Sequence, residues 1–408
     1  AKDPLRIGFI GSGFIAKFHL KSFTGVRNTQ IVGVFSPSAE KREAFAQLVN
    51  DQGLGPCEAH GTLEALLASD IDAVWVLSPN YARVATFETI AEMAAAGTSR
   101  IKAVACEKPL GRTLGEAKRV LELTERAGLL HGYLENQLFS TAVERGRDII
   151  WQRAVPATGR PYLARAAEEH AGPHEPWFWN GEHQGGGVMS DMMCHSIEVG
   201  RYLLTAPGEP RDALTLKSVS GMIAFLKWTQ ERYAKRLARK NADLDYRNRP
   251  SEDFARALIT FEDPDGHEVI VEATTSWTFV GAGLRIDLEM MGPEYSMQFS
   301  SLSTGLRIFM SREVEGAEGE DLVEKQNAEQ GLMPVVDDEA GLYGYTLENR
   351  HMAERFAAGL MPDETFSDGV EVSRIIMALY KSAEEGRVIK ATEMDDLDDY
   401  VAPTARPA

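Results

Sequence analysis

Two short stretches of the sequence carry side chains whose types and spacing could do chemistry. Asp191 and His195 stand four residues apart in a stretch that we expect to be helical, so both lie on one face, where the carboxylate could hold or tune an imidazole that exchanges a proton. Lys108 precedes Pro109, which restricts the lysine backbone to an extended form and fixes the direction of its ammonium group. From these residues alone, a surface ion pair and a solvated lysine stay open as alternatives.

A glycine-rich turn precedes both stretches. In Gly11-Ser12-Gly13-Phe14-Ile15-Ala16 the first glycine allows a tight turn, the second lets backbone N–H groups approach a pyrophosphate, and the alanine permits close packing of helix on strand. The turn follows the apolar run Leu5–Ile10 and opens a helical stretch, whose positive end would face the phosphates. This context predicts a dinucleotide site that includes Gly11, Gly13, Phe14 and Ile15, rather than a turn that only joins strand to helix.

The end of the second predicted strand bears on the choice between NAD and NADP. NAD enzymes usually place a carboxylate there for the adenosine ribose, whereas this chain reads Phe35-Ser36-Pro37-Ser38, with Lys41 and Arg42 shortly after. No acid is present there to repel a 2′-phosphate, and no arginine follows Ser36 directly. The sequence leaves NAD and NADP open, and Ser36 is either a cofactor contact or only a turn residue.

The order of apolar runs places these residues in two domains. Strands alternate with helices over residues 1–137, which predicts a dinucleotide-binding Rossmann domain with a doubly wound parallel sheet. Over residues 138–392 a Gly/Pro-rich connection from Pro156 to Gly187 is followed mostly by consecutive strands, which predicts a substrate-binding and oligomerisation domain on a largely antiparallel or mixed open sheet. The fold class is α/β plus α+β, and residues 393–408 are expected to form a mobile acidic tail.

The composition limits the classes of partner and compartment. The chain has 408 residues, and 43 basic against 61 acidic side chains give a net charge of -18, which argues against a nucleic acid or an anionic membrane as the main partner. Its three cysteines match neither a zinc pattern nor a disulfide framework, which favours a reducing compartment. No apolar stretch approaches the roughly 20 residues that span a bilayer. We expect a cytoplasmic protein, while the alanine at residue 1 leaves open whether a leader was removed.

One segment departs from this acidic background. The basic segment, Met222–Arg249, holds eight basic and three acidic side chains. A solvated helix face or a subunit contact is the simpler interpretation, and attraction of an anionic substrate is the alternative.

Other side chains give weaker signals. Trp177 and Trp179 could stack on the C–H face of a sugar or pack in a loop core, and the sequence leaves both open. Cys194 is interpreted as a small buried helix residue rather than a nucleophile. A group of potential metal ligands lacks the regular spacing of a metal site, so we predict none; its members are Glu168, Glu169, His170, His174 and His183.

Together the motifs resemble one family, the glucose-fructose oxidoreductase, inositol dehydrogenase and rhizopine-catabolism group (Gfo/Idh/MocA). The resemblance extends over nearly the whole chain and rests on Gly11–Ala16, Ser78-Pro79-Asn80, Glu107-Lys108-Pro109, Asp191-x-x-x-His195 and Ala378–Ala383. It implies that Lys108 binds and polarises the reacting hydroxyl, that His195 takes its proton, and that Asp191 contacts the substrate. It also implies a cofactor site that includes Ser78, Pro79, Asn80, Glu107 and Lys108.

Three residues depart from the usual pattern of that family. Arg83, Met193 and Glu198 stand where many members have histidine, glycine and aspartate. These differences bear on the shape of the substrate more than on the class of reaction.

The resemblance implies an NAD(P)-dependent oxidoreductase that moves hydride between the nicotinamide and a hydroxyl carbon of a sugar, polyol or glycoside. The resemblance suggests substrate contacts from Lys108, Asp191 and His195, and the residue types alone add Trp177 and Trp179. Two alternatives stay open: a glycoside-cleaving enzyme that oxidises transiently and eliminates with tightly held NAD, and a non-catalytic sugar or nucleotide sensor. The presence of both a lysine and a proton acceptor argues against the sensor. We also expect a homo-oligomer, since the open sheet would otherwise leave one face uncovered, and the resemblance implies a homodimer or homotetramer.

Overall fold

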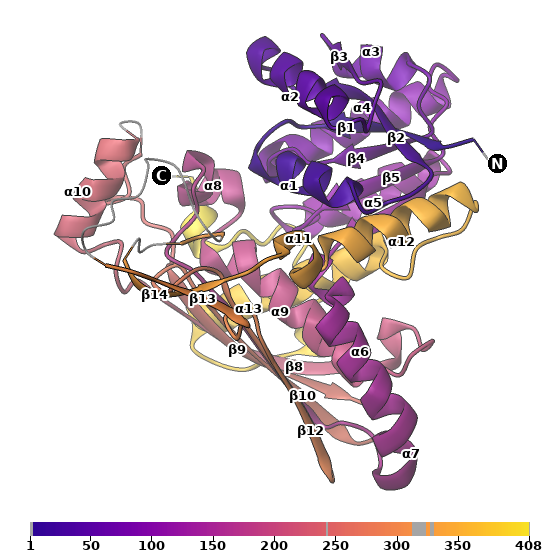
Figure 1. The fold of residues 1–408 in the computed structure, drawn as a ribbon. Helices are drawn as coiled ribbons and strands as arrows, with labels where there is room; N and C mark the ends of the chain where they lie inside the picture. The colour runs from indigo at the N-terminus through magenta and orange to yellow at the C-terminus, as the bar shows by residue number, and fades with distance from the viewer. Residues whose placement is uncertain (1–2, 242–243, 312–323, 327–329, 408) are drawn as a thin grey trace. The chain divides into compact units, whose positions relative to one another are not determined.

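The chain forms two compact units in a computed structural model that describes residues 3–241, 244–311, 324–326 and 330–407 (Figure 1). The N-terminal unit consists of Ala1–Ser140 and Tyr343–Ser373, and the C-terminal unit consists of Thr141–Leu342 and Arg374–Ala408. The sequence predicts a single boundary at residue 137, whereas the first unit of the structure ends at Ser140 and includes the later segment Tyr343–Ser373. An amphipathic helix shows which of its faces is buried, not which part of the chain covers it.

The N-terminal unit is built on a six-stranded sheet whose strand order is β3-β2-β1-β4-β5-β6, with every pair parallel. Its strands are β1 Leu5–Ile10, β2 Thr29–Phe35, β3 Glu58–His60, β4 Ala73–Val76, β5 Ala103–Glu107 and β6 Leu130–Leu134. The strand order reverses direction between β1 and β4, and ligands of such sheets bind outside the carboxyl ends of the strands at this point. The predicted doubly wound parallel sheet is confirmed.

Helices connect the strands of this unit, a further helix comes from the returning segment, and some of these helices start with a side-chain cap. They are α1 Phe14–Phe23, α2 Ala39–Asp51, α3 Leu63–Ala68, α4 Arg83–Ala95, α5 Leu114–Arg126 and, from the returning segment, α12 Tyr345–Ala357. Ser38, Thr62 and Thr113 accept hydrogen bonds from the first turns of α2, α3 and α5. The returning helix α12 packs on α1, with the rings of Phe18 and Tyr345 4.9 Å apart.

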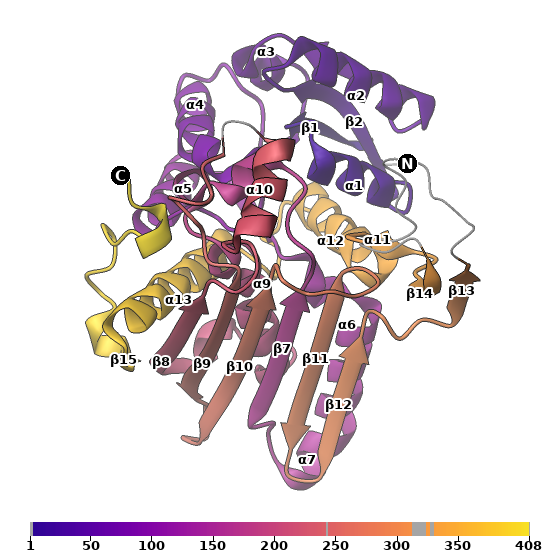
Figure 2. The same ribbon diagram turned by 90° about the vertical axis from the view of Figure 1, so that its left-hand side faces the viewer.

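The C-terminal unit is built on a seven-stranded sheet of order β12-β11-β7-β10-β9-β8-β15, seen side by side in Figure 2. The strands are β7 Leu163–Glu169, β8 Thr215–Ala224, β9 Phe254–Glu262, β10 Glu268–Ser276, β11 Arg285–Gly292, β12 Tyr295–Ser300 and β15 Ile389–Lys390. Only the pair of β7 and β10 is parallel, so the predicted mixed, largely antiparallel sheet is confirmed. Helix α9, Val188–Leu204, packs on β7, β9 and β10.

Strand β7 lies within the stretch that the sequence analysis interprets as a Gly/Pro-rich connection. Its sequence, LARAAEE, has small alanines at the buried positions Ala164 and Ala166 instead of the large β-branched residues that mark a strand. The alternation of buried and exposed positions is present, but alanine carries too weak a signal for it to be recognised.

The remaining elements lie outside the six- and seven-stranded sheets. They are α6 Thr141–Ile149, a π-helical turn Ile150–Ala154, α7 Val155–Thr158, α8 Gly181–Gln184, α10 Glu231–Lys240, the ribbon β13 Leu306–Met310 with β14 Gly331–Val335, α11 Glu339–Leu342 and α13 Phe366–Glu385. Short 3-10 turns lie at Asn80–Ala82, Asn136–Phe139, Pro176–Trp179, Arg211–Ala213, Ala391–Glu393 and Pro403–Ala405.

The C-terminal residues differ from the expected mobile tail. Met394 and Leu397 are buried, and the Thr404 hydroxyl donates to the Glu252 carboxylate at 2.7 Å. Buried apolar side chains therefore hold this stretch against the rest of the unit, although its composition is acidic. Across the described residues, no helix combines the length and the apolar character that crossing a membrane requires.

Candidate functional site

The glycine-rich turn of the N-terminal unit joins β1 to α1 and leaves space beside its second glycine. Gly11 has φ +120°, and a Cβ there would lie 2.6 Å from the Leu77 carbonyl oxygen, so only glycine fits. A Cβ on Gly13 would meet no atom within 4 Å. The turn therefore has one glycine for its conformation and one that leaves the backbone open to a ligand.

The same turn offers unused hydrogen-bond donors. Among the described residues, the buried hydroxyls of Ser12 and Ser78 have no hydrogen-bond partner, and α1 begins after Gly13 without the side-chain cap found on α2, α3 and α5. Exposed N–H groups at a helix start, with free hydroxyls nearby, suit the oxygens of a diphosphate. These residues fit a dinucleotide.

The other predicted cofactor residues follow the carboxyl ends of neighbouring strands. Ser36 follows β2 and is buried, and the Arg42 guanidinium donates to its carbonyl oxygen at 3.3 Å. Asn80, after β4, is buried in the turn that begins with it. Phe14 is exposed at the start of α1, beside Ile15, which is half-buried. Parallel packing of β1, β2 and β4 thus brings these predicted positions to one edge of the sheet.

Glu107 ends β5 and holds the backbone of Lys108. One carboxylate oxygen accepts the Lys108 N–H at 3.0 Å, and the other lies 2.8 Å from His19 Nε2. Burial raises the pKa of Glu107, but the hydrogen bond to His19 and the nearby charges of Lys108 and Arg83 outweigh it, so the pKa lies below its usual value. Glu107 is thus an anion that orients the residue after it.

Arg83, one of the departures from the family pattern, also acts on Lys108. Its guanidinium donates to the Lys108 carbonyl oxygen at 3.2 Å. The Lys108 main chain is therefore fixed on both its N–H and its carbonyl side.

A hydrogen-bonded group that the sequence analysis missed supports Glu107. The side-chain amide of Asn349, on α12, donates to His19 Nδ1 at 2.8 Å, and its oxygen accepts the Trp75 indole N–H at 2.8 Å. His19 stands on α1, after the glycine turn, where its place in the helix gives no sign of a partner. Asn349 is far away in sequence, and no local pattern could have paired the two.

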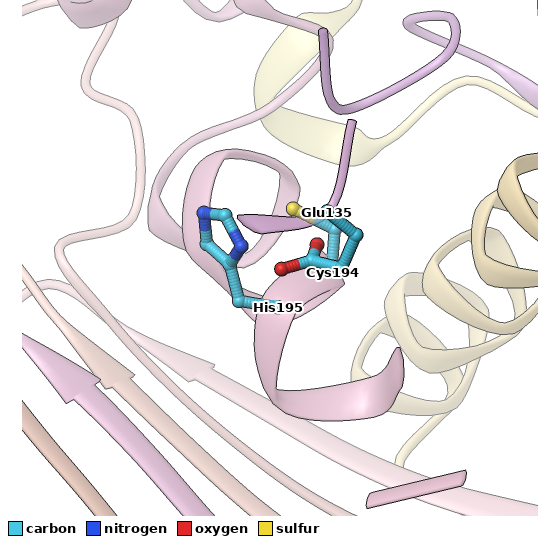
Figure 3. A group of neighbouring side chains, drawn as sticks. All are labelled: Glu135, Cys194 and His195. Atoms are coloured by element: carbon cyan, nitrogen blue, oxygen red, sulfur yellow. The ribbon is translucent and has the colours of Figure 1, made fainter. Parts of the chain in front are cut away.

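Helix α9 of the C-terminal unit carries the predicted acid–base pair. Asp191 and His195 are both buried on it, and Figure 3 shows His195 and Cys194 projecting from this helix. Asp191 Oδ2 accepts the indole N–H of Trp277 at 3.1 Å, and His195 Nε2 lies 3.8 Å from Glu168 Oε2. The pair is an interior one, in place of the surface ion pair that the sequence left open. Glu135, also labelled in Figure 3, belongs to the N-terminal unit, just after β6.

The start of α9 is held by a carboxylate from a distant part of the chain. Glu252 accepts the N–H groups of Gly187 and Met189 at 2.9 and 3.1 Å, and the Tyr380 hydroxyl at 2.6 Å. Burial raises the pKa of Glu252, while the hydrogen bonds from Tyr380 and Thr404 act in the opposite direction. This cap fixes the helix turn that carries Asp191.

The remaining predicted residues divide into packed and partly exposed ones. Trp177 is half-buried with its ring 3.8 Å from that of Phe178, whereas Trp179 is buried, as in the loop-core alternative. Cys194 is buried, with its thiol 3.4 Å from the Asp191 carbonyl oxygen. Glu198 is buried between Arg201 and Arg211, which gives it a structural ion-pair role. Contact of either tryptophan with a substrate stays a prediction.

Comparison with family models gives two matches, one in each half of the chain. Residues 5–133 match the model described as an oxidoreductase family with an NAD-binding Rossmann fold, and residues 156–296 match the Gfo/Idh/MocA C-terminal domain. The two matches cover parts of both units of the structure.

Curated relatives are similar at low identity. The 1,5-anhydro-D-fructose reductase of Ensifer adhaerens is 29% identical over 53% of this chain and 61% of its own length. The levoglucosan dehydrogenase of Pseudarthrobacter phenanthrenivorans is 22% identical over 98% of this chain and 96% of its own length. The match to the reductase thus spans less than two thirds of that relative.

Solved structures share the fold. GenD2 from gentamicin A biosynthesis, in complex with NAD, gives a TM-score of 0.75 at 22% identity, covering 95% of this chain and 96% of that one. Levoglucosan dehydrogenase in complex with NADH gives 0.69 at 18% identity, covering 95% and 99%. These likenesses extend over both units.

Proposed function

Because the chain belongs to the Gfo/Idh/MocA family of oxidoreductases, we propose that it is an NAD(P)-dependent dehydrogenase acting on a hydroxyl carbon of a sugar, polyol or glycoside. The observation that carries the proposal is the buried pair of Asp191 and His195 on one face of α9, with the carboxylate hydrogen-bonded and the helix start capped. A module that only bound a ligand would have no need to bury a proton acceptor.

The proposal gives each side chain a distinct task. The Gly11–Ala16 turn would hold the phosphates of a bound dinucleotide, whose nicotinamide ring would supply the hydride acceptor. Lys108 stabilises the alkoxide that develops as the hydroxyl is deprotonated, and His195 accepts that proton. Asp191 orients the substrate hydroxyl. Glu107 binds no substrate itself and holds the Lys108 backbone through the 3.0 Å contact.

Relatives support the substrate class. Their names include an anhydrofructose reductase, a levoglucosan dehydrogenase, a D-glucoside 3-dehydrogenase of Escherichia coli and inositol 2-dehydrogenases. All of these names denote carbohydrates or polyols, and none of them alone identifies the substrate of this chain.

The test is to purify the protein, identify any retained nucleotide by mass spectrometry, and screen sugars, polyols and aryl glycosides with NAD and NADP. Net formation of reduced cofactor, followed by absorbance, is the expected result. Cleavage of an aryl glycoside without net reduction would replace the proposal with redox-assisted cleavage, and binding without turnover would replace it with a sensor.

A further inference from the structure

The basic segment, Met222–Arg249, exposes cations on its helix and buries two of its aromatic rings. On α10 the cations Arg232, Lys235 and Arg236 are exposed, while Ala234 and Leu237 are buried. The segment also contributes Trp228 and Tyr246 to the interior of the C-terminal unit. Its contribution to the fold therefore comes through these buried residues rather than through its charge.

Trp228 and Tyr246 belong to a group of four rings that we name the aromatic cluster. Trp179 lies at its centre, with ring centroids 5.0 Å from Trp228, 5.4 Å from Tyr246 and 5.2 Å from Trp277. Edge-on and tilted contacts at these distances are favourable and fix the orientation of each ring.

Hydrogen bonds attach the basic segment to the strand end that carries Trp277. The Trp228 indole N–H donates to the Trp277 carbonyl oxygen at 2.8 Å. The Asp253 carboxylate accepts the backbone N–H groups of Lys227 and Trp228, both at 2.8 Å, and the Asp253 carbonyl oxygen accepts the Trp277 N–H at 2.8 Å. Trp277 is thus held on its N–H, its carbonyl and its ring.

The indole ring of Trp277 contacts the carboxylate of Asp191 in the candidate site. Trp277 is 0% exposed, and its indole N–H donates to Asp191 Oδ2 at 3.1 Å. An indole N–H is a donor only and does not titrate. It therefore offers the carboxylate the same hydrogen bond at every pH.

We propose that Trp277 is a positioning residue for Asp191 and that the basic segment serves to hold it, through Trp228. The catalytic consequence rests on the proposed dehydrogenase function, whereas the structural link does not. Loss of the indole N–H removes one of the contacts that orient the Asp191 carboxylate toward the substrate. Loss of the Trp228 indole N–H loosens Trp277 and acts in the same direction with a smaller effect.

The kinetic test compares Trp277→Phe with Trp151→Phe. Trp151 is a matched control because it is a buried tryptophan of the same unit whose indole N–H donates to a backbone carbonyl, that of Leu203, at 3.0 Å. Trp277→Phe should lower kcat/KM for the sugar about tenfold, the scale of one hydrogen bond to a charged group, and leave the KM for the cofactor unchanged. Trp228→Phe should lower it less, and Trp151→Phe should not lower it. Equal kcat/KM values in the Trp277 and Trp151 variants would overturn the positioning role.

A second test needs no activity. The protein has six tryptophans, so labelling with 5-fluorotryptophan gives a small set of ¹⁹F resonances that single Trp→Phe variants assign. Asp191→Asn should shift the Trp277 resonance and not that of Trp151. Trp228→Phe should shift Trp277 and Trp179. An unshifted Trp277 resonance in Asp191→Asn would overturn the proposed link, whereas a shifted one in a protein without dehydrogenase activity would uphold the link and reject the function.

Discussion

His195 is the candidate proton acceptor of the C-terminal unit. It is buried on α9, and its Nε2 lies 3.8 Å from the carboxylate of Glu168. Because an acceptor must be deprotonated before it acts, oxidation should rise with pH through its titration. His195→Ala should lower turnover about 10²- to 10⁴-fold, abolish that rise and leave cofactor affinity nearly unchanged. Steady-state kinetics across pH, with cofactor titration, measure all three.

His183 is an exposed histidine of the same unit and supplies the control for this prediction. His183→Ala should retain turnover. Near-normal turnover and an unchanged pH profile in His195→Ala would reject the assignment, and His183 or Tyr162 would then have to be examined as acceptor.

Glu348 of α12 makes a second prediction at the scale of a residue. It is 0% exposed, neither of its carboxyl oxygens has a hydrogen-bond partner among the described residues, and burial, then the charges of Glu107 and Glu135, raise its pKa well above the usual value. A carboxyl whose pKa is higher in the folded chain binds more protons when folded, so stability falls as pH rises from the unfolded pKa toward the folded one.

Glu348→Gln removes this titration at nearly constant shape. We expect its melting temperature to exceed that of the wild type at about pH 8, on the order of 2–4 °C for each kcal/mol, and to approach it near pH 4, around the unfolded pKa. Thermal unfolding over this range measures the difference, and Glu354→Gln, exposed on the same helix, should show none. A pH-independent difference would mean that Glu348 does not titrate in this way.

At the scale of elements, the turn between β1 and α1 decides nucleotide binding. A Cβ at Gly13 meets no protein atom within 4 Å, so Gly13→Val should fold normally and fill the space that a diphosphate needs. We expect at least a tenfold loss of affinity for NAD or NADP by calorimetry, equivalent to about 1.4 kcal/mol, without a change in melting temperature. Gly61→Val, also without an atom within 4 Å, should bind as the wild type does. Unchanged affinity in a folded Gly13→Val protein contradicts the site.

The packing of α12 against the rest of its unit gives a stability prediction. Asn349 accepts the Trp75 indole N–H at 2.8 Å in a fully buried position, so Asn349→Ala leaves that donor without an acceptor. We expect a loss of about 1–3 kcal/mol in the free energy of unfolding. Combined with Trp75→Phe in a double-mutant cycle under denaturant, the two changes should be non-additive by about 1 kcal/mol. Strict additivity would show that the hydrogen bond does not stabilise the unit.

At the scale of the whole molecule, one face of the C-terminal sheet has a surface suited to association. Cross-strand partners place Leu258, Glu272, Arg165 and Glu289 in one row across β9, β10, β7 and β11. Arg165 pairs with both glutamates at 3.2 Å, and Leu258 is 47% exposed. On this face the charges of the row are paired with one another and a leucine is exposed. These features support the prediction of a homodimer or homotetramer.

Light scattering at about micromolar concentration should therefore give a mass above the 45.0 kDa of one chain. Leu258→Arg should lower that mass, whereas Leu360→Arg, an equally exposed leucine of the N-terminal unit, should not. A monomeric wild type would reject the prediction.

The chemistry-bearing residues were predictable because each depends on local order. The glycine turn follows a buried strand, Lys108 follows another, and Asp191 and His195 share a helix face whatever surrounds it. The same local order predicts both sheets and the family. Strand β7 is not predicted from the sequence, because alanines replace the large residues that usually identify a strand.

Only the tertiary structure decided what holds those residues in place. Asn349 supports Glu107 through His19, Glu252 caps α9, and Trp277 anchors Asp191. Each of these partners is far away in the chain, and one buried asparagine, glutamate or tryptophan looks like any other in sequence. Periodicity determines which face of an element is buried, whereas the identity of the covering residue depends on how distant segments pack, and no local pattern records that.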